Sequence, residues 1–244
     1  MSNYYETGHA KNVANFQDLI AFCTGYGATY NPTKSALKLP QLNTLFTSGQ
    51  NALADVVTKN TAYNNAVNAR IASFDGLRAL STRLINAFQT TDATTEKIND
   101  AKGFNRKIQG KRASKIDTPV DPNAPAPTTI STSQQSYDQL IEHFSKLIEI
   151  LKSEPTYTPN ETDLKIITLT AQLTALKTAN TNVTNAYTAI SNARIARDKT
   201  LYKEKTGMYD VTLDVKNYVK SLYGISSPEF KQLSKIKFSK PKTA

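Results

Sequence analysis

Residues 164–222 read LKIITLTAQLTALKTANTNVTNAYTAISNARIARDKTLYKEKTGMYDVTLDVKNYVKSL, and their apolar residues recur at alternating steps of three and four. This spacing places one apolar stripe along a helix and is typical of a long helix packed in a bundle or a coiled coil. The residues between the stripe positions are mostly Thr, Asn, Lys, Glu and Asp. The sequence therefore predicts one long amphipathic helix, whose stripe is formed by Ile166, Leu169, Leu173, Leu176, Val183, Tyr187, Ile190, Leu201, Met208, Val211, Val215, Tyr218 and Leu222.

A stretch earlier in the chain repeats this pattern. Residues 68–72 and residues 192–196 both read NARIA. Upstream of them, YNP at residues 30–32 corresponds to YTP at residues 157–159. Further matches follow in the same order along both halves, which indicates a tandem duplication. We expect each copy to consist of a short helix, a long helix and a second short helix.

The two copies are predicted at residues 1–112 and 134–244, with a linker at residues 113–133 between them. The linker contains four prolines among Asp, Asn, Ala and Thr, a density that neither a helix nor a strand tolerates. An extended segment of this length can return the chain to the start of an antiparallel second copy. We therefore predict an all-α fold, an elongated helical bundle or antiparallel coiled coil in which the two copies pack as one bundle.

The boundaries of the helices follow from glycine, proline and capping residues. The long helices are rich in threonine, a mediocre helix former, so tertiary packing must hold them. Asp92 and Asn160 are expected N-caps because their side chains can accept a backbone N–H. The expected helices cover residues 11–24, 40–90 and 93–108 in the first copy, and residues 134–152, 161–222 and a short segment from 228 in the second.

The predicted stripe is not wholly apolar. Asn180, Arg194, Arg197 and Glu204 fall at positions that the heptad pattern assigns to the core, and Arg70 matches Arg194 in the repeat. Such residues can fix the register of the helices or lie where a thin bundle leaves the stripe wet. The alternative is a central polar layer in which Arg70 and Arg194 form a basic pocket for an anion.

Few residues here could carry chemistry. Two histidines, His9 and His143, and one cysteine, Cys23, lie too far apart in sequence for a recognisable zinc site. The chain has no glycine-rich phosphate loop and no common hydrolase or metalloprotease motif. We expect Cys23 to be buried among apolar neighbours and His143 to lie at a solvated position. The sequence favours a non-catalytic protein with no metal and no cofactor.

Charge gives the one functional hint. The chain has 30 Lys and Arg against 20 Asp and Glu, a net charge of +10. Each predicted copy ends in a basic segment without acids, at residues 101–116 and 230–244. Such a segment suits phosphate groups, although basic helix ends also complement the helix dipole and aid solubility. The candidate anion- or RNA-binding residues are Lys102, Arg106, Lys107, Lys111, Arg112, Lys115, Lys231, Lys235, Lys237 and Lys240.

Cellular location and oligomeric state can also be predicted from the sequence. No stretch approaches the roughly 20 apolar residues of a transmembrane helix, and no signal peptide is visible at the start of the sequence. We therefore expect a cytoplasmic protein. A chain that contains both copies can satisfy its own apolar stripe, which favours a monomer and leaves a homodimer open.

Three segments carry a resemblance to a known group. They read NFQDLI at residues 15–20, AKGFNRKIQGK at 101–111 and DPNAP at 121–125. In these segments the chain resembles uncharacterised proteins of flavobacteria and related bacteria. The resemblance implies a bacterial origin and no particular activity. For function we therefore expect a non-catalytic interaction or scaffold protein with an unknown protein partner. The alternative is a basic RNA- or ribosome-associated factor.

Overall fold

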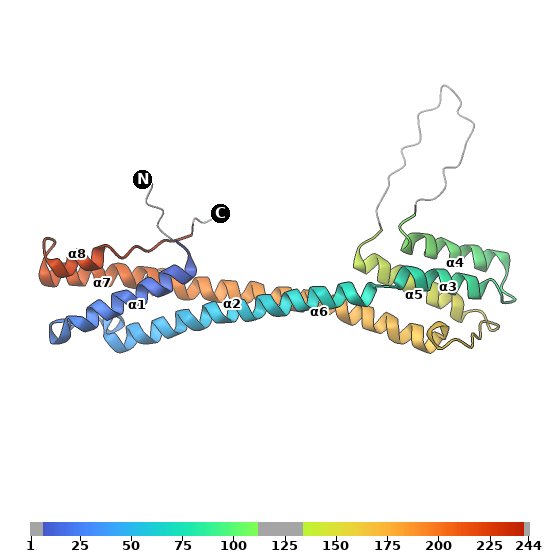
Figure 1. Ribbon diagram of the computed structural model, residues 1–244, viewed down its shortest axis with the longest axis horizontal. Helices are drawn as coiled ribbons and strands as arrows, with labels where there is room; N and C mark the ends of the chain where they lie inside the picture. Colours follow the sequence, from blue (N-terminus) through green and yellow to red (C-terminus); the bar gives the residue numbers. More distant parts are fainter. Residues whose placement is uncertain (1–6, 112–133, 242–244) are drawn as a thin grey trace, which may run out of the picture. The chain divides into compact units, whose positions relative to one another are not determined.

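The computed structural model describes residues 7–111 and 134–241, and within them the only regular elements are helices (Figure 1). The predicted all-α fold is therefore confirmed. The predicted linker lies outside the described residues. The α-helices are α1 (His9–Gly25), α2 (Leu39–Phe74), α3 (Leu77–Phe88), α4 (Thr95–Ile108), α5 (Tyr137–Lys152), α6 (Ile166–Tyr202), α7 (Met208–Tyr223) and α8 (Pro228–Ser234).

The predicted helix over residues 164–222 is two helices, so that prediction is wrong. Helix α6 ends at Tyr202, and Lys205 then adopts a left-handed backbone conformation with φ of 64°. At Gly207 a Cβ atom would lie 2.5 Å from the backbone nitrogen of Lys203, so only glycine fits this turn. The first copy breaks in the same way, because Gly76 with φ of 75° separates α2 from α3.

Two other predicted boundaries also differ. Thr94, not Asp92, is the N-cap of α4, and its side chain accepts a hydrogen bond from the backbone N–H of Lys97. Asn160 does not cap α6, because a short 3-10 turn at Thr162–Leu164 precedes that helix. Because the residues after Asn160 form this short turn, the long helix starts later than a capping argument predicts.

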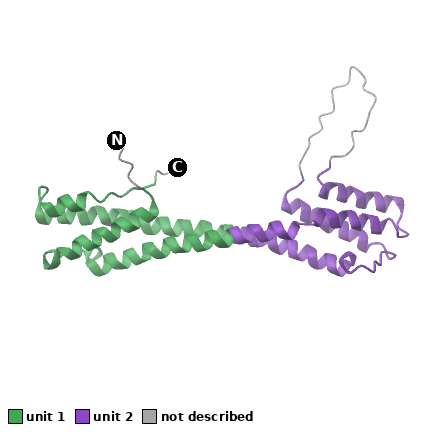
Figure 2. Cartoon of the chain, in the orientation of Figure 1, with its two compact units in different colours: residues 1–63, 186–244 green, residues 64–185 purple. Residues whose placement is uncertain are grey.

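The chain forms two compact units that do not coincide with the predicted copies (Figure 2). Unit 1 is residues 1–63 with 186–244, and unit 2 is residues 64–185. Helices α2 and α6 each begin in one unit and end in the other. Each unit therefore combines part of the first predicted copy with part of the second.

Helices α2 and α6 run antiparallel within each unit. In unit 1 the rings of Tyr63 and Tyr187 lie 5.9 Å apart, and Gly49, earlier in α2, faces Leu201, later in α6. In unit 2, Arg70 bonds to Asn180, and α2 and α6 again run in opposite directions (Figure 1).

Each unit has its own hydrophobic core. The core of unit 1 joins α1, α2, α6, α7 and α8, and the side chains of Phe16, Leu42 and Val215 are fully buried in it. Cys23 is buried there too, as predicted. The core of unit 2 includes Phe88 of α3. There His143 is only 3% exposed, so the predicted solvated position is wrong.

The two turns that precede α2 and α6 have the same internal bond. The hydroxyl of Tyr30 donates to the carbonyl oxygen of Leu37 at 2.8 Å, and that of Tyr157 donates to the carbonyl oxygen of Leu164 at 2.9 Å. A duplication would produce such a match. The duplication itself stays a prediction.

Candidate anion-binding surface

The predicted basic residues lie in both units. Lys102, Arg106 and Lys107 are on α4 in unit 2, with Lys111 just beyond it, and all four are exposed. In unit 1, one lysine is on α8 and three follow it, again exposed. Arg112 and Lys115 lie outside the described residues. The described candidates are therefore Lys102, Arg106, Lys107, Lys111, Lys231, Lys235, Lys237 and Lys240.

None of these eight side chains forms an ion pair within the described part of the chain. The ion pairs there use other cations, such as Lys34 with Asp214 at 2.5 Å and Lys97 with Glu154 at 3.0 Å. Several other surface lysines are equally unpaired, so the lack of an acid partner alone does not single out these eight. Their charge is nevertheless available to an anion.

The positive charge is concentrated in unit 1. Residues 1–63 and 186–244 contain 16 Lys and Arg against 8 Asp and Glu, whereas residues 64–185 contain 14 against 12. Unit 1 therefore accounts for most of the net charge of +10. Electrostatic attraction of a polyanion should act chiefly on this unit.

The cations of α4 have a structural explanation. Arg106 and Lys107 occupy the last turn of α4, where a positive charge complements the helix dipole, and Glu96 lies in its first turn. The amide of Gln135 donates to the carbonyl oxygen of Lys107 at 2.6 Å and so helps to end the helix. These roles account for the charge pattern of α4 without a ligand.

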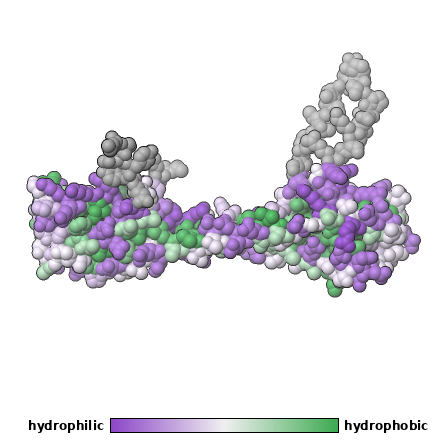
Figure 3. Space-filling model, viewed as in Figure 1, coloured by the Kyte–Doolittle hydropathy of each residue, from purple (hydrophilic) through white to green (hydrophobic). Residues whose placement is uncertain are grey.

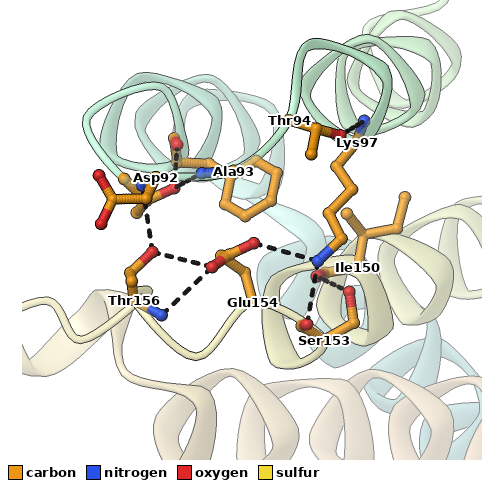
Figure 4. Close-up of polar contacts among 10 residues, drawn as sticks. Asp92, Ala93, Thr94, Lys97, Ile150, Ser153, Glu154 and Thr156 are labelled. Carbon is orange, nitrogen blue, oxygen red and sulfur yellow. Dashed lines mark hydrogen bonds and ion pairs between the residues drawn. The ribbon is translucent and has the colours of Figure 1, made fainter.

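The start of α4 is tied to the end of α5 by a nearly buried carboxylate (Figure 4). The side chain of Glu154, 8% exposed, accepts hydrogen bonds from Lys97 Nζ at 3.0 Å and from Thr156 Oγ1 at 2.9 Å. Thr156 Oγ1 in turn accepts a bond from the backbone N–H of Asp92 at 3.1 Å. The bonds from Lys97 and Thr156 lower the pKa of Glu154 below its usual value. This network fixes α4 and α5 together.

Unit 1 contains an ordered basic segment that the sequence did not reveal, residues 235–240, here called the C-terminal strap. Two buried asparagines of α1, Asn12 and Asn15, hold its backbone. Asn12 Nδ2 donates to the carbonyl oxygen of Ser239 at 2.6 Å, and the Ser239 N–H donates to Asn12 Oδ1 at 3.0 Å. Asn15 Nδ2 donates to the carbonyl oxygen of Lys237 at 2.6 Å. The two amides therefore act as a partner for the strap backbone.

Helix α7 holds the strap from a second side. Lys216 is half-buried, and its Nζ donates to the carbonyl oxygen of Ile236 at 2.5 Å and lies 5.5 Å from the ring centre of Phe238. Burial lowers the pKa of Lys216, and the nearby charge of Lys237 lowers it further. Ile236 and Phe238 pack against the core of unit 1. The strap is thus fixed by apolar and polar contacts together.

The apolar contacts turn the strap lysines outward. Ile236 and Phe238 are partly buried, whereas Lys235, Lys237 and Lys240 are exposed. The sequence signal for this arrangement is weak but present. Apolar residues alternate with lysines, and α1 carries asparagines among the apolar residues of its buried face.

The predicted polar layer places Arg70 and Arg194 in different surroundings. The Arg70 guanidinium lies 4.1 Å from the ring centre of Tyr137, and its Nη1 donates to Asn180 Oδ1 at 3.0 Å. Arg194 is exposed in unit 1. A pocket formed by both arginines stays a prediction.

Helix position pairs Arg70 with a different arginine. Both Arg70 and Arg197 are residue 32 of their helices, whereas the NARIA match is displaced by about one turn. Arg197 bonds to Asp198 at 2.8 Å, and its charge helps to lower the pKa of His9, the first residue of α1. Tyr137, beside Arg70, is likewise the first residue of α5.

Metal sites and grooves provide no stronger candidate for a functional site. In the described part of the chain, no three His, Cys, Asp or Glu side chains are grouped to hold a metal ion. A groove of about 550 Å³ in unit 2 lies between α3 and the turn before α6, and hydroxyl and amide groups predominate among its polar side chains. Its charged residues are Arg83 and Glu161, and Arg83 is already paired with Asp163.

Exposed apolar residues are scattered on the visible face of unit 1, where hydrophobic and hydrophilic residues alternate over short distances (Figure 3). The unit contains several such residues, among them Val57, Ile195 and Ile225. Single exposed apolar side chains are normal on a protein surface. No described helix has an apolar stretch long enough to cross a bilayer.

Comparison of the chain with protein-family models, with curated proteins and with solved structures found no match. The resemblance to flavobacterial proteins therefore stays a prediction.

Proposed function

We propose that this chain is a non-catalytic helical interaction protein. The observation that supports this proposal is the use made of its buried polar side chains. Asn12 and Asn15 hold the strap, and Ser81 Oγ, completely buried, bonds to Asn105 at 2.8 Å. Thr212 bonds back to its own helix at 2.8 Å. These bonds stabilise the fold itself, and among the buried polar side chains of the described residues only His143 makes no hydrogen bond.

A second candidate is a basic RNA- or ribosome-associated factor. The excess of Lys and Arg in unit 1 and the exposed, unpaired lysines of α8 and the strap favour it. Lysines that neutralise phosphates release counterions, which gives such a protein salt-dependent affinity for nucleic acid. We also propose that the protein is a cytoplasmic monomer, since each core already joins parts of both predicted copies.

One binding experiment tests both candidates. The purified, tagged protein is incubated with cell extract, with and without nuclease, at about 50 and about 300 mM salt, because nonspecific binding to polyanions weakens over this range. A protein retained at fixed stoichiometry after nuclease treatment and at high salt supports the interaction proposal. Retention of RNA or ribosomes that survives high salt supports the second candidate. If neither is retained at either salt concentration, both candidates are wrong.

The basic end of α4 separates the candidates further. Arg106, Lys107, Lys111 and Arg112 are changed together to Gln. If the partner is a protein bound elsewhere, its retention should not change. If the partner is RNA bound through all the basic segments, affinity should fall for every sequence and its salt dependence should become less steep.

A further inference from the structure

We propose that the C-terminal strap binds the phosphate backbone of single-stranded nucleic acid, independently of base sequence, through Lys235, Lys237 and Lys240. This inference rests on the second candidate function and specifies its site and ligand. Buried side chains hold the backbone that carries these lysines, which charge counting does not reveal.

The first step is the order of the strap. Its carbonyl oxygens at Ile236, Lys237 and Ser239 accept bonds from Lys216, Asn15 and Asn12 respectively. A free lysine-rich tail would lose backbone entropy when it bound a ligand. In the strap, folding has already ordered the backbone, so less entropy is lost on binding. The strap lysines therefore differ from lysines on a loose terminus.

The second step is spacing. Exposed Lys235 and Lys237 flank the inward-facing Ile236. Lys235 ends α8 in a helical conformation, and Lys237 and Lys240 follow it on a segment that is neither helix nor strand. An extended single strand can follow such a row with successive phosphates, as in the charged grooves that track single strands elsewhere. A flexible single strand can adapt its backbone to an irregular row of lysines, whereas a rigid duplex cannot.

The third step is the local field. Between residues 215 and 244 the only acidic residue is Glu229. Lys216 Nζ donates to the carbonyl oxygen of Ile236, the residue before Lys237, and the charge of Lys237 helps to lower the pKa of the half-buried Lys216. Asp214, the nearest acid before this stretch, is paired with Lys34 at 2.5 Å. A phosphate at the strap would relieve repulsion that the protein leaves uncompensated.

The fourth step concerns the bases. Stacking on aromatic rings adds affinity in many single-strand-binding proteins. Here Phe238 packs against the core, and the hydroxyl of Tyr202 is engaged by Asn12 at 3.1 Å and by His9 at 2.9 Å. The proposed contact is therefore made by the strap lysines, without stacking of bases on either ring. Contact through phosphates alone positions a strand but reads no sequence.

The test measures binding of fluorescently labelled 20-nucleotide single strands, of U-rich and mixed sequence, and of a duplex of the same length, by anisotropy from about 50 to about 200 mM salt. The strap variant is Lys235→Gln, Lys237→Gln and Lys240→Gln. Two control variants carry the same change in charge. One changes Lys38, Lys199 and Lys220, exposed lysines of unit 1, and the other changes Lys102, Arg106 and Lys111 of unit 2.

We expect the strap variant to bind single strands about tenfold more weakly at low salt, with the slope of log affinity against log salt reduced by about 2, since each phosphate contact adds about 0.7. The controls should change affinity less than about threefold. Both single-stranded sequences should bind alike and more tightly than the duplex. Equal losses in all three variants, or tighter binding of the duplex, would overturn the strap proposal while leaving the RNA candidate intact. No binding by the unchanged protein would overturn both.

A further variant separates order from charge. Asn12→Ala with Asn15→Ala keeps every lysine but removes three hydrogen bonds to the strap. Trypsin should then cut after Lys235 and Lys237 faster than in the unchanged protein, and single-strand affinity should fall at constant net charge. Circular dichroism checks that the helices remain. Faster cleavage without loss of affinity would mean that order of the strap plays no part in binding.

Discussion

His143 and Phe104 pack together in unit 2 with their ring centres 6.4 Å apart, and neither ring nitrogen of His143 has a hydrogen-bond partner among the described residues. A buried neutral imidazole without partners is costly, and a charged one would cost far more. Lys107 of α4 and Lys146 of α5 add repulsion against the charged form, and Glu142 opposes them. Burial is the largest cause of the lowered pKa of His143.

Unfolding of unit 2 should therefore become easier as the pH falls below neutrality. The folded pKa of His143 lies below its unfolded value of 6.5. Between these values the unfolded chain binds a proton that the folded chain does not, so stability falls as the pH decreases through 6.5 toward the folded pKa. Urea midpoints at pH 7.5 and 5.5 measure the effect.

His143→Leu, which replaces the imidazole with an apolar side chain, is the matched variant for that pH dependence. It should lose less stability than the unchanged protein over the same interval. His9, whose pKa is also lowered, acts in the same direction from unit 1 and remains in the variant. An identical pH dependence in both proteins would rule out His143 as its source.

Gly207→Ala should destabilise the turn between α6 and α7. The new Cβ would lie 2.5 Å from the backbone nitrogen and 2.7 Å from the carbonyl oxygen of Lys203, and backbone atoms cannot move aside as a flexible side chain can. We expect a loss of about 2–3 kcal/mol in the free energy of unfolding, measured with urea.

The control for this change is Gly103→Ala in the middle of α4. No atom lies within 4 Å of the Cβ added there, and the backbone is helical. Alanine at this position should stabilise the protein by up to about 1 kcal/mol. Opposite signs for the two substitutions would support the geometry of the turn. A neutral Gly207→Ala would contradict it.

Apolar periodicity predicts most helices of this chain but cannot predict its two units. The stripe of Leu169, Leu173 and Leu176 demands burial whichever helix supplies the partner surface, so the sequence leaves the partner undetermined. The break after Tyr202 depends on Lys205 in a left-handed conformation, which lysine seldom adopts. Neither feature has a local sequence signal strong enough to override the heptad.

The sequence predicts which lysines form the candidate surface, but it does not predict how the strap that contains them is held. The number of lysines identifies Lys235 and Lys237. Their alternation with Ile236 and Phe238 suggests a loose tail unless the partner of the strap backbone is known. That partner is Asn12 on α1, more than 220 residues earlier in the chain. A contact at such sequence separation has no periodicity to reveal it.

The clamp between Lys97 and Glu154 should make unit 2 sensitive to acid at a lower pH. Hydrogen bonds from Lys97 and Thr156 lower the folded pKa of Glu154 below its usual value of 4.5. The stabilisation is therefore present above 4.5 and is lost as the pH falls through the folded pKa. Glu154→Gln should lower the Tm at pH 7 and reduce the further loss on acidification.

The exposed pair of Lys152 with Glu149 provides the comparison for this clamp. Both its side chains are more than 60% exposed, so Glu149→Gln should leave the Tm almost unchanged, as for most surface ion pairs. Equal effects of Glu149→Gln and Glu154→Gln would contradict the role given to the clamp.

The thiol of Cys23 should report on the opening of unit 1 alone. Cys23 is fully buried, and burial raises its pKa to about 12, so at pH 8 it is both inaccessible and protonated. Since only the thiolate reacts, a thiol reagent should label the native protein far more slowly than the protein in urea. Mass spectrometry of the labelled protein over time measures the rate.

Gly207→Ala, which disturbs a turn within unit 1, should speed labelling, whereas Glu154→Gln in unit 2 should not if the two cores open independently. Equal acceleration by both substitutions would mean that the units unfold as one.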